Sequence, residues 1–226
     1  MQRFLVACAL LAGCGGDDGT SSGPDAAGEC AASGRYLPLT TGRTWTYKVT
    51  DTTAHTVSMK TQAVGARESI DTIHAGISAF KLTTTKPGGT TDSWQEDTGT
   101  EIRRHAENDN AGATTSTEHY DPYRIRVDET PAHTATGATW MQSYTEVVST
   151  GGAAPVSTVK TETWSVIAAD EKIDVPAGTF CTLHVHRSSV VGSVAGSVKD
   201  YWFAREVGKI KEAGDGQTEE LSAYTR

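Results

Sequence analysis

Hydrophobic and polar residues alternate along most of this chain, and the alternation is its strongest structural signal. Between residues 44 and 50, Trp45, Tyr47 and Val49 share one face of an extended segment, and threonines and a lysine take the other. A period of two is typical of β-strands with one buried face. Threonine, valine and the aromatic residues, which recur throughout, also favour a pleated surface.

Eleven further segments have the same character and are separated by turn-like sequences rich in Gly, Pro and Asp. Roughly a dozen short strands at this spacing predict an all-β fold, a curled antiparallel meander that forms either an open barrel or a sandwich. The polar segment 106–117 is expected to be an exposed loop. The further strand candidates are 57–64, 77–85, 90–96, 100–105, 123–128, 141–149, 157–168, 180–190, 198–204, 209–212 and 219–225.

The motif Thr-Gly-x-Thr-Trp occurs twice, at residues 41–45 and 136–140. Each copy precedes a strand candidate that contains a tyrosine, Tyr47 or Tyr144. The glycine permits a tight turn, and the tryptophan would enter the core at the start of the strand. The repeat suggests that the domain contains two related halves, and a chance match is the alternative.

The start of the chain has the pattern of an export signal ending in a lipid-attachment site. Arg3 supplies a positive charge, and residues 4–11 are apolar but too few to span a bilayer, which takes about 20. Residues 11–14, Leu-Ala-Gly-Cys, resemble the lipobox of bacterial lipoproteins. The resemblance implies that residues 1–13 are a signal peptide and that acyl chains on Cys14 hold the protein at a membrane. An ordinary signal peptide and a cytosolic protein with an apolar start are the alternatives.

Residues 14–33 are rich in Gly, Ser and acidic residues and have little apolar surface to bury. We expect them to be a flexible tether, followed by a single β domain over 34–226. Gly15 follows the lipobox cysteine, where an aspartate retains enteric lipoproteins in the inner membrane. The resemblance therefore implies an outer-membrane anchor, with the domain facing the periplasm or the cell surface.

The net charge limits the binding partners that the protein can have, and its cysteines bear on the cellular compartment in which it folds. The formal net charge is −8, and no cluster of Lys and Arg offsets it along the sequence, so we expect no nucleic-acid partner. If Cys8 leaves with the signal and Cys14 is acylated, Cys30 and Cys181 remain. An exported compartment is oxidising, which predicts a Cys30–Cys181 disulfide, with two free thiols as the alternative.

Three phrases in the domain carry a family resemblance: YLPLTTGRTWTY at 36–47, VPAGTF at 175–180 and YWFAREVGKIK at 201–211. They resemble a family of uncharacterised bacterial lipoproteins and secreted β-domains of unknown function. That family is loosely similar in architecture to the curled sheets of lipoprotein carriers of the LolA/LolB type. The resemblance implies a fold and brings no catalytic residues.

His184 and His186 are the sharpest candidates for chemistry. They stand two apart on one strand face and could share a metal, but zinc usually needs a third protein ligand, for which the chain offers His74, His105 or His119. We expect the pair to face solvent or a polar lumen without binding metal, and we expect no cofactor. The chain also has no Gly-x-Ser-x-Gly nucleophile motif. The opposite face of the strand is apolar: Cys181, Leu183 and Val185.

Four tryptophans, Trp45, Trp140, Trp164 and Trp202, are expected to fill the core, or alternatively to line an apolar cavity. The sequence therefore favours a membrane-anchored envelope lipoprotein. Its non-enzymatic β domain would bind or present an apolar ligand or an envelope protein. One alternative is an envelope hydrolase, metal-dependent or otherwise, that uses His184 and His186. Another is a structural or adhesive surface protein.

Overall fold

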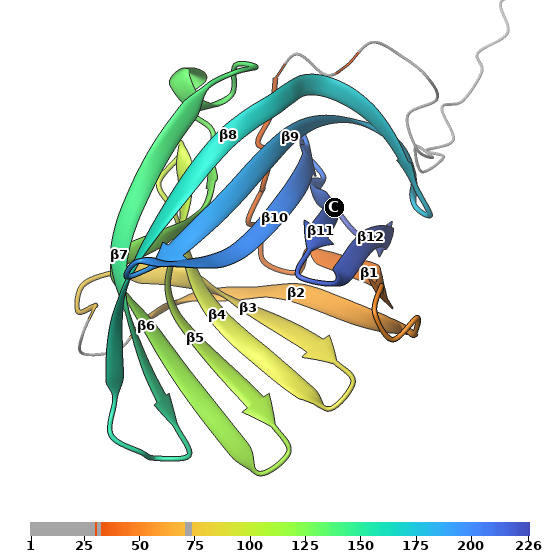
Figure 1. The fold of residues 1–226 in the computed structure, drawn as a ribbon. Helices are drawn as coiled ribbons and strands as arrows, with labels where there is room; N and C mark the ends of the chain where they lie inside the picture. The colour runs from red at the N-terminus through yellow and green to blue at the C-terminus, as the bar shows by residue number, and fades with distance from the viewer. Residues whose placement is uncertain (1–29, 31–32, 71–73) are drawn as a thin grey trace, which may run out of the picture.

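The computed structural model describes residues 30, 33–70 and 74–226, in which twelve antiparallel strands form a closed barrel (Figure 1). Each strand pairs with its neighbours in chain order, and β1 pairs with β12 to close the barrel. The predicted all-β curled meander of about a dozen strands is confirmed. The elements are β1 (Thr44–Asp51), β2 (Val57–Ser69), β3 (Ser78–Lys86), β4 (Gly89–Asp97), β5 (Glu101–Ala111), β6 (Thr114–Asp128), η1 (Pro131–His133), β7 (Thr139–Thr150), β8 (Val156–Val175), β9 (Gly178–Val191), β10 (Val194–Ala204), β11 (Gly208–Gly214) and β12 (Gln217–Tyr224).

The two ends of the barrel differ in construction. One end, which we call the mouth, consists of six hairpin turns, at 52–56, 87–88, 112–113, 151–155, 192–193 and 215–216. The other end, the floor, carries the remaining connections and the segment 33–43 that precedes β1. In Figure 1 the β3–β4 and β5–β6 hairpins of the mouth point to the bottom of the view, and η1 lies at the top.

The segment 33–43 binds the connections of the floor together. The guanidinium of Arg35 pairs with Glu129 at 2.9 Å and with Asp97 at 2.8 Å. The backbone oxygen of Arg35 also accepts a hydrogen bond of 2.7 Å from the amide of Glu206. Because these partners lie in or directly next to three different connections, the segment holds the connections of the floor together. Five of its residues are buried: Tyr36, Leu37, Pro38, Leu39 and Arg43.

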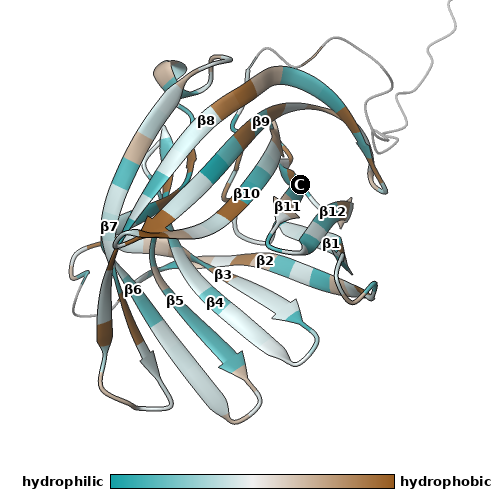
Figure 2. Cartoon of the chain, in the orientation of Figure 1, coloured by the Kyte–Doolittle hydropathy of each residue, from teal (hydrophilic) through white to brown (hydrophobic). Residues whose placement is uncertain are grey.

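Apolar side chains from strand ends at the floor form the core. Trp45 and Ile102 open their strands there, while Val127 and Phe203 come near the ends of theirs, and all four are buried in one cluster. Alternation continues along the strands, as the bands of hydrophobic and hydrophilic colour on β8, β9 and β10 show in Figure 2. The core occupies the floor side of the barrel and leaves the side near the mouth to polar residues.

The expectation of an exposed loop at 106–117 was wrong. This segment forms the adjoining ends of β5 and β6 and the tight turn at 112–113 between them. Its polar residues have partners on the neighbouring hairpin: Asp109 accepts a hydrogen bond of 2.6 Å from Thr91 and pairs with Lys86 at 2.9 Å. Cross-strand contacts of this kind override the low β-propensity of Asn and Asp.

The two copies of Thr-Gly-x-Thr-Trp have the same local structure. Gly42 and Gly137 have φ of +90° and +85°, and their amides donate hydrogen bonds of 2.9 Å to the carbonyl oxygens of Val64 and Val166. In each copy the carbonyl of the next residue accepts from the same valine amide, again at 2.9 Å. The copies lead into β1 and β7, six strands apart in the barrel.

Candidate ligand-binding site

The barrel encloses a cavity of about 820 Å³. At the floor its lining includes Leu37 and, from the end of β10, Phe203. At the other end it includes Thr56, Pro87 and Gln217, which are solvent-exposed residues of the mouth. The cavity therefore opens through the mouth, and its volume lies within the range of about 300–1,000 Å³ usual for small-molecule sites.

The wall of this cavity is rich in cations, although the chain as a whole carries −8. Four carboxylates that do not line the cavity, Asp109, Glu146, Glu162 and Asp215, pair with cations of its wall. The wall cations still outnumber these four carboxylates and the acidic residues of the lining taken together. A concave surface lined by one sign of charge concentrates ions of the opposite sign. Nine basic residues line it, Lys60, Lys86, Arg104, Arg124, Arg126, Lys160, Arg187, Lys199 and Lys209, with three acidic ones, Glu107, Glu212 and Glu219.

The lysine side of the wall, on β2 and β10–β12, is largely self-neutralised. Lys60 contacts Glu219, which pairs with Lys209 at 2.7 Å, and Glu212 joins Lys209 at 2.5 Å to Lys199 at 2.6 Å. Burial would raise the pKa of Glu212, but Lys209 and Lys199 hold that pKa well below its usual range. Burial, followed by the charge of Lys209, lowers the pKa of Lys60 to about 8. These three lysines thus share Glu212 and Glu219, and Lys199 also lies 3.9 Å from Asp215.

The arginine side of the wall, on β4–β6, places like charges next to each other. Arg104 on β5 is the direct cross-strand partner of Arg124 on β6, and on its other side it is the partner of Gln95 on β4. Arg126 lies two residues along β6 from Arg124, and both line the cavity. Like charges directly opposite each other destabilise a sheet, so the sheet itself does not favour this arrangement.

The positive charges of two of these three arginines are paired with carboxylates. Arg104 contacts Glu107, three residues along the same strand. Arg124 pairs at 2.8 Å with Glu162, which is almost completely buried and also accepts a hydrogen bond of 3.1 Å from Arg187. Glu162 is therefore shared between two guanidinium groups, which leaves this part of the wall with a surplus of positive charge.

Arg126 has no ion pair and no protein hydrogen bond among the described residues, and its Nε is buried without a partner. Burial lowers the pKa of Arg126, and the neighbouring charge of Arg104 acts in the same direction. Gln95 is 2% exposed; its amide nitrogen donates to Ser93 at 3.0 Å, whereas its Oε1 has no partner. The lining therefore offers both an unused cation and an unused hydrogen-bond acceptor.

The four tryptophans proposed from the sequence do not line this cavity. Trp45 and Trp164 lie in the buried core, and Trp140 and Trp202 pack against it. The cavity that the barrel encloses is polar and charged, and it differs from the apolar, tryptophan-lined cavity that was the alternative to core filling.

His184 and His186 lie on the outer side of β9 and hydrogen-bond to carboxylates. The two nitrogens of His184 contact Glu171 at 2.9 Å and Asp200 at 3.1 Å, and Nδ1 of His186 contacts Asp200 at 3.0 Å. The imidazole of His184 also stacks on Trp202, with ring centroids 4.2 Å apart. Within the described ranges no group of three or more His, Cys, Asp or Glu residues is arranged to hold a metal ion.

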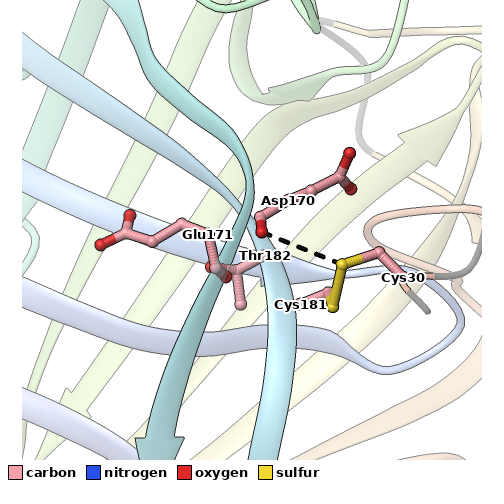
Figure 3. Close-up of a disulfide and its surroundings, with 5 residues drawn as sticks. All are labelled: Cys30, Asp170, Glu171, Cys181 and Thr182. Atoms are coloured by element: carbon pink, nitrogen blue, oxygen red, sulfur yellow. Dashed lines mark hydrogen bonds between the residues drawn. A yellow bond between two sulfur atoms is a disulfide. The ribbon is translucent and has the colours of Figure 1, made fainter. Parts of the chain in front are cut away.

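The predicted disulfide between Cys30 and Cys181 is present, with its Cα atoms 5.5 Å apart (Figure 3). It fixes residue 30 to β9 close to the floor, beside the backbone of Asp170. Cys14, the signal peptide and the tether up to residue 29 lie outside the described residues. In the part of the chain that is described, no helix has the length and apolar character needed to cross a membrane.

Sequence reasoning missed the arginine side of the wall, although one signal for it was visible. Arg124 and Arg126 flank a single isoleucine, and this spacing puts two arginines on one face of a strand. The expectation that inward positions are apolar led away from that interpretation. Their proximity to Arg104 depends on the register of β5 and β6, which the sequence pattern does not specify.

Comparison with known proteins finds a similar structure and no matching family. No family profile and no curated protein matches this chain. A crystal structure of a candidate lipoprotein from Parabacteroides distasonis is similar over 88% of this chain and 100% of that one, with 11% sequence identity and a TM-score of 0.44. Similarity at this level carries no functional inference.

Proposed function

We propose that this protein is an exported, lipid-anchored binding protein that captures a small anionic solute in the lumen of its barrel. The observation that carries the proposal is the inversion of charge: cations dominate the lining of an open cavity of about 820 Å³ in a chain with net charge −8. The polar lining favours a charged ligand over the apolar ligand considered from the sequence.

The place where the chain enters the barrel supports an orientation for this binding protein. The segment 33–43 and the disulfide at Cys30 are both at the floor, opposite the mouth. Acyl chains on Cys14 would lie about 16 residues before Cys30, a root-mean-square distance of about 20–24 Å for a flexible chain. The mouth would then face away from the membrane, toward the compartment from which solute arrives.

Lipid attachment is tested by metabolic labelling with palmitate in a bacterium that processes lipoproteins. Wild type should give a labelled band that fractionates with membranes, and Cys14→Ser should give an unlabelled precursor of higher mass. The matched control Cys8→Ser should be processed as wild type is. A labelled mature band from Cys14→Ser would contradict the assignment.

Anion capture is tested with three four-carbon ligands that differ mainly in charge: succinate, succinamide and putrescine. Calorimetry and thermal melting of the processed protein in detergent, at about 20 mM salt to limit screening, should show binding of succinate only. Affinity should fall as salt rises. Equal responses to succinate and succinamide, or preference for putrescine, would contradict an anion site.

A further inference from the structure

Resting on the proposed anion site, we propose that its ligand is a small polyhydroxylated anion, a sugar acid or sugar phosphate. Its acidic group would bind Arg126, which lies two residues along β6 from Arg124 and near Arg104. A hydroxyl of the ligand would donate to the side-chain oxygen of Gln95. The proposed ligand therefore carries one anionic group and several hydroxyl groups.

The charges of the wall select one anionic group. The lysine side pairs its own charges through Glu212 and Glu219, so it offers little to a second anion. On the arginine side, Glu107 pairs with Arg104 and Glu162 pairs with Arg124, whereas Arg126 has no carboxylate partner among the described residues. Guanidinium groups bind carboxylate and phosphate through paired hydrogen bonds, which is the chemistry that Arg126 leaves unused.

The same ion pairs disfavour a zwitterion such as a free amino acid. All three glutamates that line the cavity are engaged: Glu107 with Arg104, Glu212 with Lys209 and Lys199, and Glu219 with Lys60 and Lys209. A ligand ammonium would therefore meet no free carboxylate and would be repelled by the surplus cations.

The uncharged part of the wall favours hydroxyl groups. An unsatisfied acceptor in a buried position costs free energy unless a donor reaches it, and Oε1 of Gln95 is such an acceptor, directly opposite Arg104 in the sheet. A hydroxyl next to an acidic group can bond to Gln95 while the acid binds the arginines. Seven further Ser, Thr and Gln residues line the cavity at positions from mouth to middle: Thr56, Ser58, Gln62, Thr84, Thr91, Ser197 and Gln217.

Arg126 also gives the proposal a signature that a merely structural residue would lack. The side chain makes no protein hydrogen bond or ion pair in the described structure and stands beside two like charges. Replacing it by methionine should therefore raise the melting temperature of the ligand-free protein, by about 2 °C or more. A structural arginine would lower the melting temperature when replaced.

The test compares glucuronate, glucose 6-phosphate, glucose, glucosamine and hexanoate by calorimetry on the processed protein. We expect glucuronate or glucose 6-phosphate to bind at least tenfold more tightly than the other three, and which of the two binds better separates a carboxylate from a phosphate ligand. Arg126→Met should lose at least tenfold in that affinity. Lys48→Met, which removes a lysine of β1 outside the cavity lining, should leave that affinity unchanged.

A second variant addresses the hydroxyl contact. Gln95→Leu should weaken the preferred sugar anion at least fivefold and leave the affinity for hexanoate unchanged. If hexanoate binds wild type as tightly as the sugar anions, the polyol assignment is wrong while anion capture stands. Arg126→Met with wild-type affinity would overturn the role of Arg126. If neither succinate nor any of these anions binds, the proposed function itself fails.

Discussion

The indole of Trp45 lies against Gly208, so close that a Cβ at that glycine would stand 2.8 Å from the indole nitrogen. The same nitrogen donates a hydrogen bond of 2.6 Å to the carbonyl oxygen of Val207. Gly208 has φ of +115°, a backbone angle that residues other than glycine rarely adopt. The start of β1 and the connection between β10 and β11 are thereby held together at the floor, where the apolar core is packed.

Gly208→Ala should therefore destabilise the barrel by about 2 kcal/mol or more, because both the backbone angle and the contact with Trp45 oppose a methyl group. Gly42→Ala is the matched control, since Gly42 also has a positive φ of +90° but no atom within 4 Å of its Cβ position. Gly42→Ala should lower the free energy of unfolding by about 1 kcal/mol. Urea denaturation of the two variants measures both values, and equal losses would show that the contact with Trp45 is unimportant.

Much of the fold could be predicted from the sequence because local patterns specify it. Alternation between residues 44 and 50 marked β1, and turn-like Gly, Pro and Asp residues stand at the β8–β9 and β11–β12 connections. Closure into a barrel could not be predicted, because it depends on pairing between β1 and β12, which are far apart in the chain. The segment 106–117 was misassigned because its strand character comes from neighbours such as Thr91 and Lys86.

Less of the candidate site could be predicted, for a related reason. The two cysteines, Cys30 and Cys181, could be paired by elimination once an exported compartment was assumed. The charged residues of the lumen could not be predicted, because in the sequence a charged residue that points inward looks the same as one that points outward until the strand register is known. Arg104 and Arg124 are 20 positions apart in sequence, and only the β5–β6 register brings them opposite each other.

The Cys30–Cys181 disulfide should stabilise the barrel, because it joins residues separated by 151 positions. On the loop-entropy account, a crosslink of this length contributes up to about 5 kcal/mol. Cys181→Ser should lower the urea midpoint, and a reductant should lower the midpoint of wild type toward the same value. Peptide mapping without reduction should recover the two cysteine peptides linked. Alkylation of both cysteines without reductant would contradict the bond.

His184 and His186 should not confer zinc binding, because their nitrogens already contact Glu171 and Asp200 on the outer wall. The double change His184→Ala with His186→Ala should cost about 1 kcal/mol, mainly through loss of stacking on Trp202. Melting curves with zinc and with chelator should coincide for wild type and for the double variant. A gain of several degrees with zinc in wild type alone would restore the metal-enzyme hypothesis.

The lowered pKa of Lys60, about 8, predicts that anion capture and stability respond to pH in opposite directions. Lys60 is mostly protonated at pH 7 and mostly neutral at pH 9. Its charged neighbours should keep their charge over this range, because the pKa of Lys209 is raised and the pKa values of Glu212 and Glu219 are lowered. Loss of one positive charge from the wall should weaken succinate binding about three- to tenfold between pH 7 and 9.

Stability should rise over the upper part of that range. The folded protein binds the Lys60 proton less tightly than the unfolded chain, whose lysine has a pKa of 10.5, so between about pH 8 and 10.5 the unfolded state holds more protons. Rising pH therefore relieves the cost of burying the charged form. Lys60→Met should abolish both trends, whereas Lys48→Met, on the neighbouring strand outside the cavity lining, should leave both unchanged. Succinate affinity that stays constant from pH 7 to 9 in wild type would exclude Lys60 from the anion site, because its loss of charge would then have no effect on the ligand.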